Sequence, residues 1–444
     1  MSLFPTAGRG LNGIFRSLQY RNFRLYFGGQ SLSLIGSWMQ RTAIYWLAYR
    51  LSNNSVFILA VVACAGQIPC LFLTPLGGVA ADRYNRYKAL LIAQTLAMVQ
   101  ASILAVLVLT GTAAVWHLAV LNILLGTINA FDMPIRQAFM VEMIDSRADL
   151  GNAIALNSSM VNAAKMLGSF LGGALIATAG EGACFTVNAI SYLAVIVSLL
   201  LMRIAPAGRK RVGQGVWRQL KEGIAYTFGF APIKYIIAFL SLASLTGMSS
   251  YMVLMPVFAK DILGGGSRAY GFLMGASGVG ALAGAVYLAG RRSIPGLEKI
   301  MVLATFLFGV GLVGFSLSAT MWISMIFMLL AGFGMMVQMA SCNTVLQTIA
   351  SDDMRGRVIS IYIMSFMGVI PFGSLLAGGL AHWIGAPATL LIGGLCCVLG
   401  SVLFAGKLPY LREMIHPIYV ERGVIPAVAK GIQAATDLTM PPED

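Results

Sequence analysis

The 444-residue chain is 58% hydrophobic and only 10% charged, with a mean hydropathy of +0.82. Soluble domains carry about 25% charged residues, so this composition excludes an ordinary soluble protein. The net charge of +14 comes from bases scattered among short loops, which indicates membrane topology rather than nucleic-acid binding. The six cysteines lie within apolar segments and show no disulfide or metal-ligand spacing, so we expect no metal and no other cofactor.

Long apolar segments recur along the chain and predict transmembrane helices of roughly 20 residues. We expect spans at 23–49, 55–78, 87–110, 114–134, 151–178, 182–202, 233–259, 268–290, 298–318, 321–343, 358–382 and 387–406. These twelve spans predict an all-α membrane protein with two sets of six helices. The predicted parts are an N-terminal lead at 1–22, a first bundle at 23–202, a basic linker at 203–232, a second bundle at 233–406 and a tail at 407–444.

The two sides of the predicted membrane differ sharply in charge. If the N-terminus is inside, only Arg50, Lys260 and Arg268 among the bases fall outside. Because basic loops stay on the cytoplasmic side, we predict that both termini are cytoplasmic. The linker also carries apolar residues at helical spacing across 216–228, which favours an amphipathic helix at the membrane interface. A flexible linker is the alternative.

A short turn after the second predicted span, PLGGVAADRYNRYK, concentrates charge. It holds Asp82, Arg83 and Arg86 shortly after Gly78. A helix that started near Asp82 would place Asp82 and Arg86 on one face, because they are four residues apart. The turn resembles the signature between the second and third helices of the major facilitator superfamily, although Asn85 stands where glycine is usual.

The two predicted bundles are similar to each other in their fifth spans. GSFLGGALIATAG in the first half compares with GSLLAGGLAHWIG in the second. Such repeats are typical of transporters built from duplicated units. The glycines expected to allow close helix packing there are Gly168, Gly172, Gly173 and Gly373. With the twelve spans and the charged turn, the resemblance implies two pseudo-symmetric six-helix bundles of the major facilitator fold.

Two further strings resemble the superfamily branch that includes enterobactin exporters and macrolide efflux proteins. One is DMPIRQAF, which carries Asp132 and Arg136, and the other is RGRV, which carries Arg355 and Arg357. Asp132 and Arg136 are one helical turn apart, so we predict that they pair. The predicted inner gate consists of Gly78, Asp82, Arg83, Arg86, Asp132, Arg136, Arg355 and Arg357. We expect these residues to hold the gate rather than to contact substrate.

Two bases lie deep within predicted spans, where a charge is costly. Arg41 and Lys165 are therefore expected to face a wet cavity, which would favour an anionic or catecholate-like substrate. The alternative is that Arg41 reaches the outer surface and Lys165 pairs within the bundle. The predicted cavity residues are Gln30, Ser37, Gln40, Arg41, Asn162, Lys165, Tyr251 and Gln338, with Met335, Asn343 and Phe366 as further candidates.

The resemblance implies a non-enzymatic secondary transporter in the bacterial cytoplasmic membrane. We expect it to export an amphipathic organic compound, a siderophore or a drug, by alternating access. A lipid or lysolipid flippase, an importer and a non-transporting receptor are the alternatives. Proton coupling is left open, because Asn122 occupies the position of the usual arginine before Gly126 and no acid is expected deep in a span. The expected partners are a small molecule and membrane lipids, and the expected state is a monomer.

Overall fold

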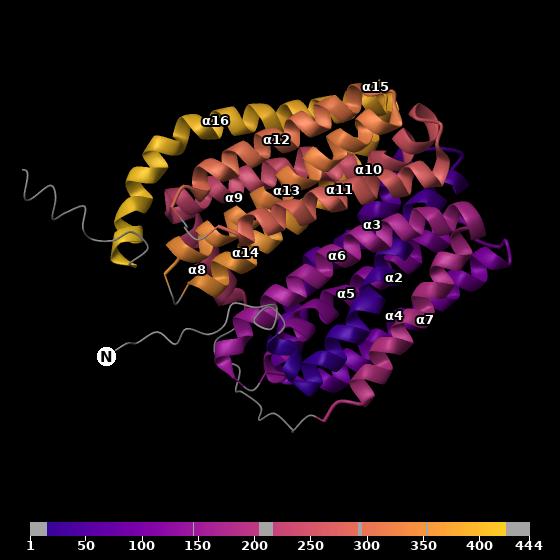
Figure 1. Ribbon diagram of the computed structural model, residues 1–444, viewed down its shortest axis with the longest axis horizontal. Coiled ribbons are helices and arrows are strands. Elements are labelled where there is room, and N and C mark those ends of the chain that lie inside the picture. Colours follow the sequence, from indigo (N-terminus) through magenta and orange to yellow (C-terminus); the bar gives the residue numbers. More distant parts are fainter. Residues whose placement is uncertain (1–15, 145, 204–215, 292–294, 352–353, 423–444) are drawn as a thin grey trace, which may run out of the picture.

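Helices form nearly all the regular structure of this chain. The computed structural model describes residues 16–144, 146–203, 216–291, 295–351 and 354–422, and no strand occurs in these ranges. The helices before residue 203 are η1 (Arg16–Gln19), α2 (Arg21–Leu51), α3 (Val56–Arg83), α4 (Arg86–Leu109), α5 (Val115–Glu142), α6 (Arg147–Ala179) and α7 (Glu181–Leu200). The later helices are α8 (Val216–Gly229), α9 (Ala231–Ala243), η2 (Ser244–Met248), α10 (Ser249–Val257), η3 (Phe258–Ile262), α11 (Gly266–Ala289), α12 (Leu297–Leu317), α13 (Met321–Ile349), α14 (Arg355–Met367), α15 (Ile370–Ile384) and α16 (Ala386–Glu421). Figure 1 shows the two sets as two groups of long helices side by side, which we call the N-terminal and C-terminal halves.

Eleven helical stretches within the described residues are long and apolar enough to cross a membrane. The helix α2 has 31 residues and coincides with the first predicted span, but it is not among the eleven. It carries Gln30, Gln40 and Arg41, and both glutamines are buried against neighbouring helices. The fold is therefore that of a multi-pass membrane protein, while the twelfth crossing and the orientation of the termini stay predictions.

The outer surface of both halves carries large apolar side chains. Trp116, Trp322 and Trp383 are strongly exposed and lie near helix ends at the same end of the molecule. Tryptophan prefers the boundary between lipid and water, because its ring is apolar and its N–H is polar. Their exposure near helix ends is that expected of tryptophans at a membrane boundary.

The charged turn lies between two helices rather than within one. The helix α3 ends at Arg83 and α4 begins at Arg86, so the prediction that Asp82 and Arg86 share one helical face is wrong. The reason is local, because the side chain of Asn85 accepts a hydrogen bond from the backbone N–H of Lys88 at 3.0 Å and caps a new helix. The side chain of Asp82 lies outside the described residues.

The predicted loop between the fourth and fifth spans is mostly helical. The helix α5 continues past the expected end at 134 to Glu142, and α6 begins at Arg147. Asp132 is therefore a residue of a long helix and only 3% exposed. The helix α5 therefore continues beyond Asp132, which the sequence placed close to the end of a span.

The corresponding fifth helices of the two halves differ in continuity. The helix α6 runs unbroken through Ser169. In the C-terminal half, α14 ends at Met367 and α15 begins at Ile370, so the chain breaks just before Pro371. Proline lacks a backbone N–H, so Pro371 cannot donate to the carbonyl oxygen of Met367 four residues earlier, which explains the position of the break.

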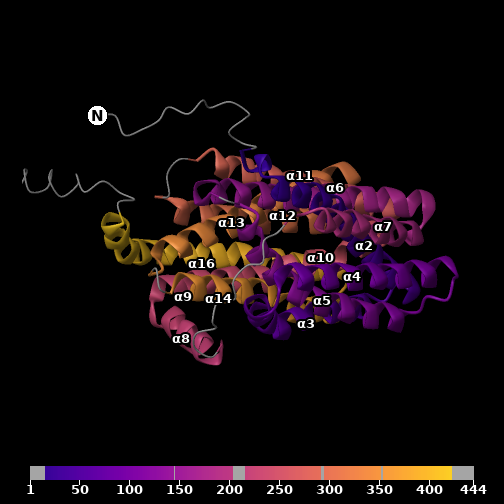
Figure 2. The ribbon, with the colours of Figure 1, turned by 90° about the horizontal axis from the view of Figure 1, so that it is seen from below.

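The linker and the tail both carry helical structure that packs on the C-terminal half. The predicted amphipathic helix is present as α8, which lies beside α9 and α14 at one end of the molecule (Figure 2). Its Ile224 and Phe228 are exposed, as expected of a helix on a membrane surface. The helix α16 continues into the predicted tail as far as Glu421, and its Leu411 and Ile415 are buried. Residues 204–215 and 423–444 lie outside the described part of the chain.

The described N-terminal end is attached to α6. Both the backbone N–H and the hydroxyl of Ser17 donate to the Asn152 side-chain oxygen, at 2.9 and 2.8 Å. The Tyr20 hydroxyl donates to the Asp149 carboxylate at 2.7 Å, and this hydrogen bond raises the pKa of Tyr20 above its ordinary value. The described part of the predicted lead, residues 16–22, is therefore tied to the N-terminal half.

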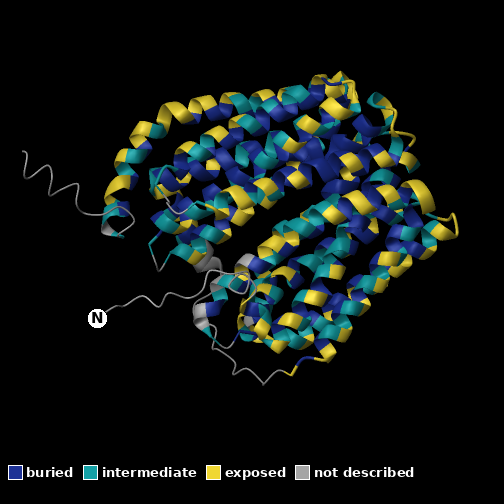
Figure 3. Cartoon of the chain, viewed as in Figure 1, coloured by how far each residue is buried: buried dark blue, intermediate teal, exposed yellow. Residues whose placement is uncertain are grey.

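The two halves meet mainly through α6 against α11 and α3 against α15. Figure 3 shows buried residues gathering where α10 and α11 approach the N-terminal half. Two glycines permit the closest approach, because a Cβ on Gly173 would lie 2.3 Å from the Cα of Gly271. Gly168 plays the same part between α6 and α2, since its Cβ would lie 2.4 Å from the carbonyl oxygen of Ile35. Gly172 faces Met39 of α2 less tightly, and Gly373 approaches the backbone of Leu245.

Candidate functional site

A cavity of about 1150 Å³ lies between the two halves. At the end that carries α8 its lining includes Gly78, Gly223 and Arg357. Toward the other end it stops near Tyr45 and Met252, which lie in the largest buried cluster of the molecule. The cavity is thus a one-sided chamber: it reaches the α8 end, which we call the open end, and is blocked at the opposite, closed end.

The wall formed by the N-terminal half is polar. Of the predicted cavity residues, Gln30, Ser37, Gln40, Arg41, Asn162 and Lys165 line it. Tyr251 and Gln338, by contrast, are buried and do not contribute to the lining, so they are core residues in this conformation. Both lie on helices of the C-terminal half whose cavity-facing positions are taken by other side chains.

The wall formed by the C-terminal half is apolar and rich in methionine. Seven methionines of this half line the cavity, namely Met248, Met252, Met335, Met336, Met339, Met364 and Met367, and we call them the methionine wall. Phe366 lies among them. Met335 and Phe366 were candidates from the sequence, whereas the gathering of residues from α13, α14 and the region around η2 depends on tertiary packing.

The two deep bases share one aromatic neighbour. The guanidinium carbon of Arg41 lies 5.1 Å from the ring centroid of Trp38, and the Lys165 ammonium lies 5.6 Å from it. Trp38 and Arg41 stand on α2, while Lys165 reaches in from α6. A cation above an aromatic face is stabilised by about 0.5–2 kcal/mol. Arg41 and Lys165 both line the cavity, and Trp38 is a shared neighbour that the sequence did not single out.

Gln40 is committed to the interior of the N-terminal half. Its amide N–H donates to Gln100 at 3.0 Å, and its amide oxygen accepts from Asn188 at 2.7 Å. Gln100 in turn donates to the carbonyl oxygen of Leu121. This buried chain of amides joins α2, α4, α5 and α7, so Gln40 stabilises the wall more than it offers free donors to the cavity.

Among the described residues that line the cavity, one is an acid, Asp132. Asp132 and Arg136 of α5 form the ion pair that their spacing predicts, and Gln94 of α4 donates to the Asp132 carboxylate at 2.7 Å. The Asp132 side chain is 4% exposed and that of Arg136 is 17% exposed. Both residues line the cavity, so this pair belongs to the chamber rather than to a surface loop.

The charged turn between α3 and α4 contacts the end of α5 through Arg86. Arg86 donates to the Glu142 carboxylate at 2.7 Å and to the backbone carbonyl oxygen of Ala81 at 2.8 Å. A Cβ added at Gly78 would meet nothing within 4 Å and would face the cavity, whereas Gly77 packs against the backbone of α5. Arg83 is exposed. Close helix packing at this turn therefore depends on Gly77, and Gly78 belongs to the cavity lining.

The second basic string braces α14 at the open end. Arg357 donates to the Glu222 carboxylate of α8 at 2.6 Å and also lines the cavity. Arg355 donates to the backbone carbonyl oxygen of Gln347 at 3.1 Å, at the end of α13. These contacts tie the linker helix α8 to the C-terminal half, and the residues of the two strings lie on different halves of the molecule.

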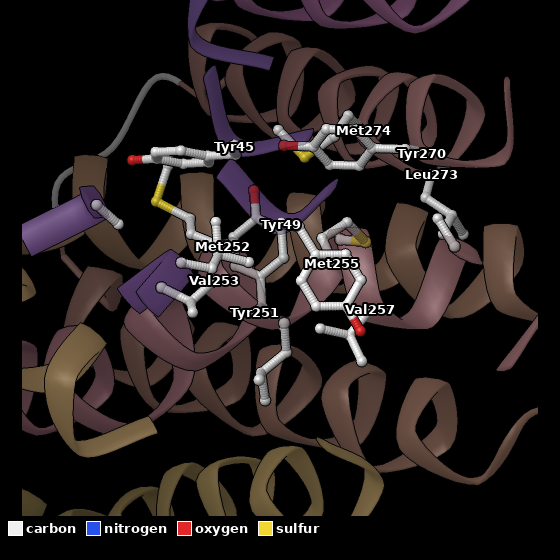
Figure 4. Packing of buried hydrophobic residues seen from close by; sticks show 14 of the residues in the cluster. Tyr45, Tyr49, Tyr251, Met252, Val253, Met255, Val257, Tyr270, Leu273 and Met274 are labelled. Carbon is white, nitrogen blue, oxygen red and sulfur yellow. The ribbon is translucent and has the colours of Figure 1, made fainter. Parts of the chain in front are cut away.

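The closed end is sealed by aromatic and polar contacts between the halves. Figure 4 shows Tyr45 and Tyr49 of α2 among Tyr251, Met252 and Tyr270 of the C-terminal half. The Tyr49 hydroxyl donates to the Asp261 carboxylate of the segment after α10. The Lys260 ammonium donates to the Asn54 side-chain oxygen at 2.6 Å. We call the pairs Tyr49–Asp261 and Asn54–Lys260 the latch; no sequence signal pointed to it, because its members are more than 200 positions apart in the chain.

Gly173→Val is expected to disfavour the conformation described here. The added side chain collides with the backbone of Gly271, and overpacking of this kind costs about 1–3 kcal/mol. Separating α6 from α11 there favours closure of the open end. A cysteine placed at Ser360, which lines the open end of the cavity, should then react with a bulky maleimide about tenfold more slowly, as a shift of ~1.4 kcal/mol implies.

Gly379→Val is the matched control, because a Cβ at Gly379 meets nothing within 4 Å. This variant should leave the rate of maleimide labelling at position 360 unchanged. Equal labelling rates in the two valine variants would show that the contact between Gly173 and Gly271 does not control the opening.

Solved structures share this fold at low sequence identity. A POT family transporter in complex with 5-aminolevulinic acid matches with a TM-score of 0.71 at 11% identity, over 88% of this chain and 96% of that one. A bacterial homologue of the human lysosomal transporter Spinster, in an inward-facing and unoccupied conformation, matches with a TM-score of 0.61 at 15% identity and the same coverage of 88% and 96%. The fold is that of a multi-helix membrane transporter.

Sequence relatives assign the family. The family model described as "Transmembrane secretion effector" matches residues 13–417. The staphyloferrin A transporter of Staphylococcus aureus is 26% identical over 388 residues, which cover 86% of this chain and 95% of that protein. The multidrug efflux pump Tap of Mycolicibacterium fortuitum is 27% identical over 388 residues, which cover 85% and 93%. The chain belongs to this family of the major facilitator superfamily, and it is a membrane transporter rather than an enzyme, as its motifs predicted.

Proposed function

We propose that this protein is a secondary exporter that moves an amphipathic organic compound, a siderophore or a drug, out of the cytoplasm by alternating access. The observation that carries the proposal is the one-sided chamber between two halves that contact each other tightly at the closed end. Such a chamber loads from one side, and it releases to the other when the halves rock about the central site. The relatives named for a staphyloferrin A transporter and a multidrug efflux pump support export.

The open end is assigned to the cytoplasm. Arg83, Arg86, Arg355 and Arg357 all lie at this end, whereas the exposed tryptophans gather at the other. An excess of Lys and Arg marks the cytoplasmic side of a membrane protein. The conformation described here is then the inward-open state of a protein of the bacterial cytoplasmic membrane, with both termini inside.

Asp132 is the residue we assign to proton coupling. It is an acid of the chamber wall, and its carboxylate is held by Arg136 and Gln94. Acids inside a membrane protein serve as proton carriers when a conformational change alters their pairing. If rocking of the halves or arrival of substrate draws Arg136 away, Asp132 gains a proton in one state and releases it in the other. The resembling signature has an arginine at the position of Asn122, and that arginine is absent here. We therefore assign proton coupling to Asp132 instead.

Transport into everted membrane vesicles tests direction and coupling together. A catecholate siderophore, a macrolide and a fluorescent dye are presented to vesicles with an imposed proton gradient. Accumulation of at least one probe above that in vesicles without the protein, abolished by a protonophore, is the expected result. Absence of gradient-dependent accumulation for every probe would contradict proton-driven export, and accumulation without any gradient would contradict the coupling alone.

A further inference from the structure

The chamber has two walls of opposite chemistry, which defines the shape of the molecule that fits between them. The N-terminal wall presents amides, hydroxyls and cations, whereas the methionine wall presents thioethers and aliphatic carbon. A ligand that is polar throughout would leave the methionine wall poorly matched. A ligand that is apolar throughout would leave buried polar groups without partners, which costs free energy. The chamber is therefore matched to an amphipathic molecule held in one orientation.

The sign of the polar group follows from how the cavity charges are paired. Arg136 is engaged by Asp132, and Arg357 is engaged by Glu222. Within the described part of the chain, Arg41 and Lys165 make no ion pair with a carboxylate, and both lie over the ring of Trp38. An aromatic face stabilises a cation but leaves its charge uncompensated. Two such cations in a membrane interior are favourable for a ligand that brings negative charge.

We propose that the chamber binds amphipathic organic anions, with the anionic group between Arg41 and Lys165 and the apolar body against the methionine wall. This proposal rests on the proposed transport function and specifies its substrate class. Methionine side chains are flexible and polarisable, so the wall accepts aliphatic and aromatic bodies of different shape. The volume of about 1150 Å³ exceeds the usual range of roughly 300–1,000 Å³ for drug-sized ligands, so the body can be large.

Binding of two matched probes to the full-length protein in lipid nanodiscs tests this assignment. Anilinonaphthalene sulfonate is an amphipathic anion, and phenylnaphthylamine has the same aromatic skeleton without the sulfonate. Calorimetric titration should give at least about tenfold tighter binding of the sulfonate probe to the wild type. Lys165→Gln and Arg41→Gln should each remove about tenfold of that affinity while leaving the affinity for phenylnaphthylamine unchanged. Met335→Ala should weaken both probes to a similar extent.

Lys234→Gln is the matched control, because Lys234 is exposed on α9 and does not line the cavity. It should change neither affinity. Equal loss of both probes in Lys165→Gln and Arg41→Gln would assign these side chains to packing, and equal affinity of the wild type for both probes would overturn the substrate class. Thermal unfolding of each variant identifies any loss of binding that results from misfolding. If Lys165→Gln misfolds, Lys165→Arg replaces it, and this variant should keep the preference for the sulfonate because it keeps the charge.

The binding experiment does not depend on transport. Selective binding of the sulfonate without transport of any probe would overturn the exporter proposal and leave the anion site standing. Gradient-driven transport in vesicles without a preference for anions would overturn the anion site and leave the exporter proposal standing.

Discussion

Asp132→Asn is expected to reduce gradient-driven transport to the level of vesicles without the protein, while substrate still moves down its own gradient. The asparagine amide cannot gain or lose a proton at physiological pH, so the proposed movement of protons in exchange for substrate is lost. Initial rates of uptake with and without an imposed proton gradient measure the effect. Loss of the driven component alone is the expected outcome, because the chamber and the latch are unchanged.

Asp132→Asn also leaves Arg136, whose side chain is 17% exposed, without its carboxylate partner. Breaking a buried ion pair by removing one partner costs about 3–5 kcal/mol, so the single variant should unfold at a lower temperature. The double variant Asp132→Asn with Arg136→Gln removes both charges and should recover much of that stability without recovering proton coupling. If the double variant transports against a gradient as the wild type does, Asp132 is a structural residue and not the proton carrier.

Crosslinking the latch is expected to stop transport in both directions. Asn54→Cys and Lys260→Cys place thiols on opposite halves where the native side chains meet at 2.6 Å. A short, reducible bifunctional thiol reagent would then hold the closed end shut, and alternating access requires that end to open. Transport should fall to background after crosslinking and return after reduction, because reduction frees the halves.

A crosslink within one half is the control for this experiment. Arg50 of α2 and Glu181 of α7 pair at 3.0 Å at the closed end, and both belong to the N-terminal half. Cysteines at these two positions, treated with the same reagent, should leave transport close to that of the uncrosslinked variant. The single variants Asn54→Cys and Lys260→Cys report the effect of the substitutions themselves. Full transport with complete crosslinking of 54 to 260 would exclude rocking about this end.

Several site features were predictable from the sequence because they are local. The spacing of Asp132 and Arg136 predicted an ion pair on one helical face, and the structure contains it. The depth of Arg41 and Lys165 within apolar spans predicted that both would face a cavity, and both line it. The prediction failed at the charged turn, because the cap formed by Asn85 starts a new helix between Asp82 and Arg86.

Other features depended on contacts that no local pattern records. Arg86 reaches Glu142, and Tyr49 reaches Asp261. Tyr251 has the residue type of a substrate contact, yet it is turned into the core of the closed end. Whether such a side chain is buried in the core or lines the cavity depends on how the neighbouring helices pack around its own helix.

The sequence by itself determined that this is a multi-pass helical membrane protein of the major facilitator superfamily, and which segments form its long apolar helices. Hydropathy, charge bias and short motifs are properties of contiguous residues, so they are visible without a structure. Only the tertiary structure decided that one end is closed and that Asp132 lies in the chamber wall. It also decided that the polar wall of the N-terminal half faces the methionine wall. These properties arise when helices more than a hundred residues apart pack side by side, because packing determines which face of each helix meets the cavity.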